Sequence, residues 1–134
     1  MKTYDEIIRY LKSYQELKYD IEFYRNKMGG LKAISYSQEE KGTAQDNIMF
    51  SYMQKIEDAE NEMKEIEKFI EDNFKGNARI IIWNKYINRD TYKQIGIDLG
   101  YDPSHCCNVA KKSIENYLKV TKKTINTTNK MSIV

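Results

Sequence analysis

The sequence contains little proline or glycine, with one Pro and six Gly in 134 residues. β-Sandwiches and β-barrels depend on many short strands joined by turns in which these two residues are common, so such folds are disfavoured. Long helices need few of either residue. We therefore expect an all-α protein.

Long apolar stretches are also missing. The chain has no run of about 18 uncharged apolar residues, which argues against a transmembrane helix and a membrane partner. The N-terminus, residues 1–6, turns acidic where a signal peptide needs an apolar segment. The length suits one domain, or a small domain with an extended appendage. We expect a cytoplasmic protein.

Residues that carry catalytic and metal chemistry are scarce. There is one histidine, His105, there is no glycine-rich phosphate loop, and the two cysteines, Cys106 and Cys107, are adjacent rather than spaced as a disulfide framework. Neighbouring residues on a helix point about 100° apart, whereas metal-binding pairs need a spacing such as Cys-x₂-Cys. We expect no enzyme, no cofactor and no metal site, with Cys106 in the core and Cys107 partly exposed.

The near-neutral total charge of +2 hides an asymmetry. Residues 1–76 hold 12 basic and 16 acidic side chains, a net charge of −4, whereas residues 77–134 hold 10 basic and 4 acidic, a net charge of +6. A basic half beside an acidic half indicates two roles, one of which involves a polyanion. The alternative is that the basic half is simply a solvated surface.

The acidic half predicts two long helices. Thr3 and Glu6 fit a capping box, in which each side chain accepts the backbone N–H of the other residue. Gly29-Gly30 ends the first helix, and residues 31–43 form a connection. The second helix, residues 44–73, has an a/d heptad pattern. The two apolar stripes are formed by Tyr4, Ile7, Leu11, Tyr14, Leu17, Ile21, Tyr24 and Met28, and by Met49, Tyr52, Ile56, Ala59, Met63, Ile66 and Ile70.

Two such helices, folded on each other, bury one stripe each, so a second copy is expected to cover the remaining edge, which includes Ile8, Ile48, Met53 and Phe69. We expect a homo-oligomer, most simply a dimer with a four-helix arrangement. The alternative is a monomer whose hairpin packs against the C-terminal domain, since a 3.5-residue period does not specify which chain supplies the seam. The expected oligomer seam comprises Tyr4, Ile7, Leu11, Ile21, Met49, Tyr52, Ile56, Met63, Ile66 and Ile70.

The basic half predicts three shorter helices. Asn77 caps the first, which extends to Ile87, and Thr91 caps the second, which ends at Gly100. Asp102 is a strong N-cap, and Pro103 at the first helical position opens a third helix that extends to about Lys119. The second and third helices fit a helix-turn-helix, in which a small residue allows the close crossing and a glycine forms the turn. Gly96 and Gly100 supply these two residues.

Residues 77–119 resemble the helix-turn-helix of sigma-70 region 4. The likeness consists of an Ile/Leu-rich helix, a Tyr before the turn, a Tyr-Lys-Gln-Ile-Gly…Leu-Gly-Tyr core and a basic helix that ends in Ile-Glu-Asn-Tyr-Leu. Two positions depart from the pattern, since Cys106 replaces the frequent Val and Gly96 replaces the usual Ala. The layout of the chain is similar to small phage regulators of the RinA/ArpU kind, which activate late genes in phages and prophages of Gram-positive bacteria. The resemblance implies a DNA-binding transcriptional regulator.

If the helix that begins at Pro103 enters the major groove, its N-terminal part meets base edges. Asn108 could bind adenine with two hydrogen bonds, and Lys111 could reach guanine or a phosphate. The predicted base-reading residues are Ser104, His105, Cys107, Asn108 and Lys111. The predicted DNA-backbone contacts are Lys85, Arg89, Lys93, Lys112 and Lys119, with Lys122 and Lys123 beyond them.

The sequence thus predicts an oligomerisation region over 1–76, a DNA-binding domain over 77–123 and a flexible tail over 124–134. The expected partners are double-stranded DNA and a second copy of the chain. Two other functions stay open. One is a DNA-recognition subunit like a phage small terminase, which would form a ring of many subunits. The other is a sigma-like module that contacts RNA polymerase.

Overall fold

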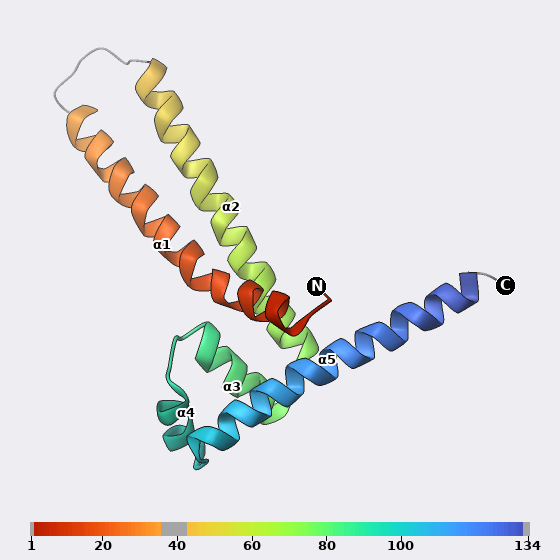
Figure 1. Cartoon of the computed structure of the whole chain (residues 1–134). Coiled ribbons are helices and arrows are strands. Elements are labelled where there is room, and N and C mark those ends of the chain that lie inside the picture. Colours follow the sequence, from red (N-terminus) through yellow and green to blue (C-terminus); the bar gives the residue numbers. More distant parts are fainter. Residues whose placement is uncertain (1, 36–42, 133–134) are drawn as a thin grey trace. The chain divides into compact units, whose positions relative to one another are not determined.

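The computed structural model describes residues 2–35 and 43–132, and the side chains of residues 2–30 and 46–122. Over these residues the chain forms helices and no strands, so the predicted all-α class is confirmed. In chain order, the helices are α1 (Tyr4–Ser35), α2 (Thr43–Asn73), α3 (Gly76–Tyr86), α4 (Tyr92–Leu99) and α5 (Pro103–Ser132) (Figure 1).

The chain divides into two compact units within its two long helices rather than at residue 76. The boundary falls between residues 12 and 13 in α1 and between residues 66 and 67 in α2. We call residues 13–66 the hairpin unit. The remainder, which contains the start of α1, the end of α2 and all of α3, α4 and α5, is the core unit.

The N-terminus of α1 is capped, although not by the reciprocal pair that was predicted. Thr3 Oγ1 accepts the backbone N–H of Glu6 over 3.2 Å, and the Thr3 carbonyl accepts that of Ile7 over 3.2 Å. The Glu6 carboxylate accepts the backbone N–H of Lys2, over 3.0 Å, in place of the expected Thr3 N–H. The Glu6 side chain thus bonds one residue earlier than predicted, and the same number of backbone N–H groups at the helix start has an acceptor.

Two predicted helix ends are wrong. α1 continues through Gly29-Gly30 to Ser35, because glycine permits a left-handed C-cap but does not enforce one, and neither residue has a positive φ. Of the predicted connection, residues 36–42 lie outside the described part of the chain. α5 continues past Lys119 to Ser132, through most of the predicted flexible tail, because no glycine or proline follows Pro103 to stop it.

The hairpin unit is an antiparallel pair of helices with few buried side chains between them. The rings of Tyr24 and Tyr52 pack with centroids 5.6 Å apart, and the Lys55 ammonium lies 5.1 Å from the Tyr24 ring. Arg25 and Glu60 form a 3.0 Å ion pair, but both side chains are largely exposed, so the pair adds at most about 1 kcal/mol. Its buried side chains are Tyr14, Ile21, Ala59 and Ile66.

The core unit has a much fuller interior. Phe69 lies at the centre of an aromatic cluster, with ring centroids 5.4 Å from Tyr10, 5.9 Å from Phe74 and 5.2 Å from Tyr117. This cluster joins the start of α1, the end of α2 and the middle of α5. The buried apolar residues of the unit are Ile7, Leu11, Ile70, Phe74, Ile81, Ile82, Tyr86, Ile87, Ile95, Cys106, Ala110 and Ile114.

These burials correct the predicted oligomer seam. Five of its members, Ile7, Leu11, Ile21, Ile66 and Ile70, are buried within a single chain and have no surface to offer a second one. The other five, Tyr4, Met49, Tyr52, Ile56 and Met63, are half-buried. Phe69, expected on the remaining edge, is half-buried in the aromatic cluster instead, and Ile8 is also half-buried. The five buried members therefore serve packing within one chain, and whether the half-buried ones also contact a second copy stays a prediction.

Candidate nucleic-acid interface

The segment between α3 and α4 is a tight turn. The Asp90 backbone N–H donates to the Asn84 carbonyl over 2.9 Å, and Arg89 between them has a φ of 61°. Thr91 then caps α4, as predicted, because its hydroxyl accepts the Gln94 N–H over 3.2 Å. Asn77 does not cap α3, because the N-cap residue of this helix is Lys75. The Asn77 side chain instead donates a hydrogen bond to the Tyr101 hydroxyl.

The turn between α4 and α5 is fixed by two glycines. Gly100 ends α4 in the left-handed conformation, with a φ of 75° that suits glycine. The Gly96 carbonyl accepts the backbone N–H groups of both Gly100 and Tyr101. The Tyr101 carbonyl oxygen lies so close to Gly96 that a Cβ there would overlap it. The small residue predicted at this position is therefore required by the turn itself.

α5 begins directly after this turn. The Asp102 carbonyl accepts the Cys106 N–H over 3.1 Å, and Pro103 is the first residue of the helix. Cys106, Ala110 and Ile114 form a buried stripe at helical spacing. Burial also raises the pKa of the Cys106 thiol, as expected for a residue in the core.

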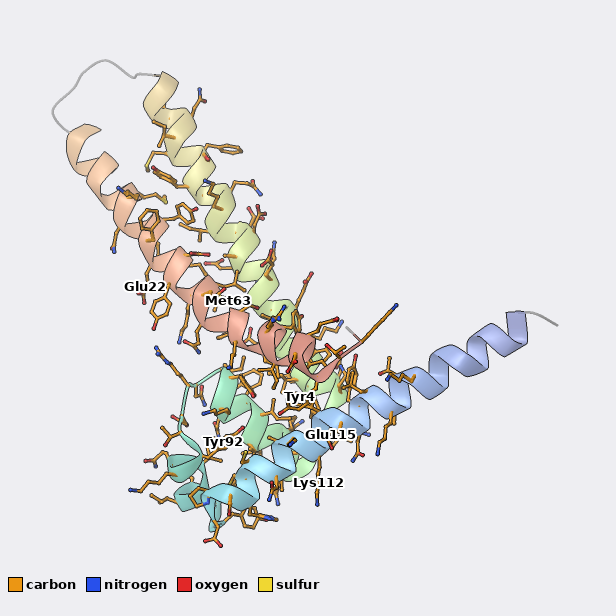
Figure 2. All side chains as sticks on the ribbon, viewed as in Figure 1. Tyr4, Glu22, Met63, Tyr92, Lys112 and Glu115 are labelled. Atoms are coloured by element: carbon orange, nitrogen blue, oxygen red, sulfur yellow. The ribbon has the colours of Figure 1, made fainter. Side chains whose placement is uncertain are left out.

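The opposite face of α5 is polar and accessible. The predicted base-reading residues all lie within its first three turns and are all exposed: Ser104, His105, Cys107, Asn108 and Lys111. Lys112 and Lys119 continue the exposed face. The exposed Glu115 lies about one helical turn after Lys112 on α5 (Figure 2). Glu115, the acidic residue of the Ile-Glu-Asn-Tyr-Leu segment, adds a negative charge to this face.

The other predicted DNA-backbone contacts come from α3, the turn after it, α4 and the later part of α5. Arg89, Lys93 and Lys122 are exposed. Lys85 is half-buried, and its ammonium lies 4.5 Å from the centroid of the Tyr92 ring, so it ties α3 to α4. The side chain of Lys123 lies outside the described residues.

A tyrosine cluster that the sequence did not predict borders this face. Burial raises the pKa of Tyr86, with a further contribution from the nearby Tyr92 and the hydrogen bond between the two hydroxyls. Burial is also the main cause that raises the pKa of Tyr4, and the negative charges of Cys107 and Glu115 raise it further. The first turn of α1 therefore lies near α5, so Tyr4, predicted in the oligomer seam, belongs to the core unit. No periodicity relates these residues, because they come from three separate helices.

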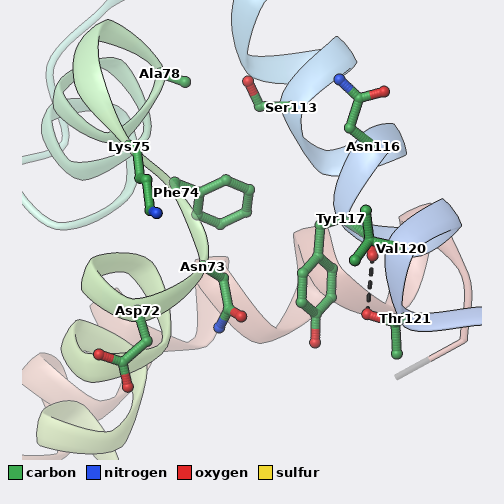
Figure 3. Close-up of a pocket in the computed structure, with 10 residues that line it drawn as sticks. All are labelled: Asp72, Asn73, Phe74, Lys75, Ala78, Ser113, Asn116, Tyr117, Val120 and Thr121. Carbon is green, nitrogen blue, oxygen red and sulfur yellow. Dashed lines mark hydrogen bonds between the residues drawn. The ribbon is translucent and has the colours of Figure 1, made fainter. Parts of the chain in front are cut away.

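A cleft of about 540 Å³ lies on another side of α5 (Figure 3). Phe74, Tyr117 and Val120 supply its apolar surface, and Asp72, Lys75 and Asn116 are among its polar lining residues. Val120 is 63% exposed. None of the predicted base-reading residues lines this cleft.

Across the described part of the chain, no group of three or more His, Cys, Asp and Glu side chains is arranged to hold a metal ion. Among those same residues, no helix is both long and apolar enough to cross a membrane. Searches of protein-family models, curated proteins and solved structures find no match to this chain.

Proposed function

We propose that this chain is a sequence-specific DNA-binding transcriptional regulator that places the first three turns of α5 in the major groove. The observation that carries the proposal is the two-sided character of this helix. Cys106, Ala110 and Ile114 anchor one side in the core, while the whole opposite side is polar and exposed immediately after a rigid turn. This is the arrangement by which a helix-turn-helix presents its recognition helix.

Charge supports a polyanionic partner. The chain from residue 77 onward carries a net charge of +6. Exposed Arg89, Lys93, Lys112 and Lys119 can contact phosphates around the helix. The N-terminus of α5 adds the partial positive charge of the helix dipole beside Ser104 and His105.

The hairpin unit supports self-association as the second element of the proposal. Its apolar side chains that remain exposed are Tyr19, Phe23, Ile48, Phe50 and Met53. A second hairpin would cover them and bring two recognition helices together, so the target site would contain two related half-sites. The resemblance to phage late-gene regulators supports the same function.

Contact with RNA polymerase is the second candidate, and the cleft beside Phe74 and Tyr117 favours it. A protein segment in that cleft and DNA on the exposed face of α5 would use different sides of one helix. A regulator that binds both would fit the predicted sigma-like behaviour.

The test is footprinting on DNA from the chain's own genomic neighbourhood, followed by two substitutions. Asn108→Ala should lose about 1–3 kcal/mol of discrimination at one base position, because it removes a base contact. Lys119→Ala should weaken binding to all sequences alike and lower the slope of log affinity against log salt by about 1. Lys64→Ala, an exposed lysine of the hairpin unit, is the matched control. Absence of any promoter-proximal binding at low salt would contradict the proposal.

A further inference from the structure

Three side chains connect α3 to the first turn of α5. Asn77 Nδ2 donates a hydrogen bond to the Tyr101 hydroxyl over 2.7 Å. The Tyr101 ring in turn stands edge-on to the His105 imidazole, with centroids 4.9 Å apart and ring planes at 75°. This edge-to-face geometry is a favoured arrangement of aromatic rings.

The backbone of Tyr101 is held on both sides. Its N–H donates to the Gly96 carbonyl over 2.8 Å, and its own carbonyl rests against Gly96 where no Cβ can be accommodated. The turn therefore fixes where the side chain starts, and Asn77 fixes where its hydroxyl ends. A tyrosine held at both ends offers the neighbouring imidazole one fixed surface.

His105 itself is exposed and has the freedom of a surface side chain except for this ring contact. An unrestrained side chain loses rotamer freedom when it meets a ligand, and that loss opposes binding. A side chain held beforehand in its binding conformation avoids most of it. The contact with Tyr101 thus affects how well His105 can read a base.

We propose that Asn77 and Tyr101 are positioning residues that hold the His105 imidazole in the orientation in which it contacts DNA. The inference rests on the proposed function, because it assigns a specificity role within the same surface. Neither positioning residue needs to touch DNA, so their effect should be confined to the base pair that His105 contacts.

The experiment first locates that base pair with His105→Ala, as the operator position at which discrimination is lost. Asn77→Ala and Tyr101→Phe should each reduce discrimination at the same position by about two- to tenfold, the range expected for the net contribution of a single hydrogen bond. The double variant should lose no more than either single variant, because both act through one bond. Asn61→Ala, in the hairpin unit, is the matched control.

Rescue distinguishes positioning from a general structural role. Asp at position 77 can accept a hydrogen bond from the Tyr101 hydroxyl, so Asn77→Asp should restore discrimination at the His105 position. The same substitution combined with Tyr101→Phe should restore nothing. The added negative charge should weaken binding to all DNA sequences alike. This effect cancels when the affinity for the matched operator is divided by the affinity for the mismatched one.

A second readout needs no DNA. His105 is the only histidine of the chain, so its ring signals can be identified directly in an NMR spectrum. Asn77→Ala and Tyr101→Phe should move or broaden those signals, and Asn77→Asp should return them toward the wild-type positions. Unmoved signals, or a loss of discrimination spread evenly over the operator, would overturn the inference while leaving the proposed function standing. Absence of sequence-specific binding by the wild-type chain would overturn both.

Discussion

The hairpin unit and the core unit share the same two long helices yet bury their apolar side chains very differently. In the core unit, Ile81, Ile82, Ile95 and Ile114 are all 0% exposed. In the hairpin unit, Phe50 is 67% exposed, and Tyr19 and Phe23 are each 54% exposed. Several short helices can enclose a core from different sides, whereas two helices alone leave one side of each in water.

This difference teaches that a heptad pattern measures how much apolar surface a helix carries, not which chain covers it. Ile70, at the C-terminal end of the heptads, is buried within the core unit, whereas Met49, at their N-terminal end in the hairpin unit, is only half-buried. We therefore expect the core unit to be stable by itself and the hairpin unit to depend on a second copy.

The largest effect should come from the interior of the core unit. Ile95→Ala should destabilise folding by about 2–5 kcal/mol, because it leaves a cavity where α4 meets α3 and α5. Denaturant unfolding followed by circular dichroism measures the change. Ile97→Ala is the matched control on the same helix, since Ile97 is 67% exposed and its loss should change stability by less than about 0.5 kcal/mol. Equal effects of the two substitutions would contradict the described core.

A second substitution tests the hairpin unit. Phe50→Ala should leave the helical content of the chain unchanged but weaken self-association, by about 1.5–3 kcal/mol if a second copy fully buries the ring. Analytical ultracentrifugation over a concentration series measures this change. Lys64→Ala serves as the surface control. A wild-type chain that stays monomeric at all concentrations would show that the exposed face has another role.

Substituting one glycine in each unit should change stability in opposite directions. Gly96→Ala in the core unit should cost about 1–3 kcal/mol, because its Cβ overlaps the Tyr101 carbonyl and the turn must shift. Gly29→Ala in the hairpin unit meets no atom within 4 Å and lies inside α1, so it should stabilise the helix by about 0.5–1 kcal/mol. Thermal unfolding of both variants checks the opposite signs. The usual Ala of the resembled pattern would therefore not fit this turn as it stands.

Features set by neighbouring residues could be predicted from the sequence. The Thr91 cap, the left-handed Gly100 and the start of α5 at Pro103 depend on side chains a few residues apart, and the accessible face of α5 follows from helical periodicity. Contacts between segments far apart in the chain could not be predicted in this way. Asn77 and Tyr101 lie 24 residues apart, and nothing in their spacing indicates a hydrogen bond. Helix ends were missed where the sequence permits a stop without requiring one, as at Gly29-Gly30.

The smallest expected effect concerns the tyrosine pair of the core unit. Tyr86→Phe removes the hydrogen bond to Tyr92 and should cost about 0.5–1.5 kcal/mol at neutral pH. Burial, the nearby Tyr92 and this bond raise the pKa of Tyr86 in the folded state, so the unfolded chain releases this proton first as the pH rises. The associated stability is complete below the unfolded pKa of about 10 and declines above it. Wild type should therefore lose stability faster than Tyr86→Phe in alkaline solution, and the difference between them should shrink. Urea unfolding at stepped pH, with tyrosinate absorbance as a parallel signal, measures both curves. Parallel curves would show that Tyr86 is not held in its protonated form by the core.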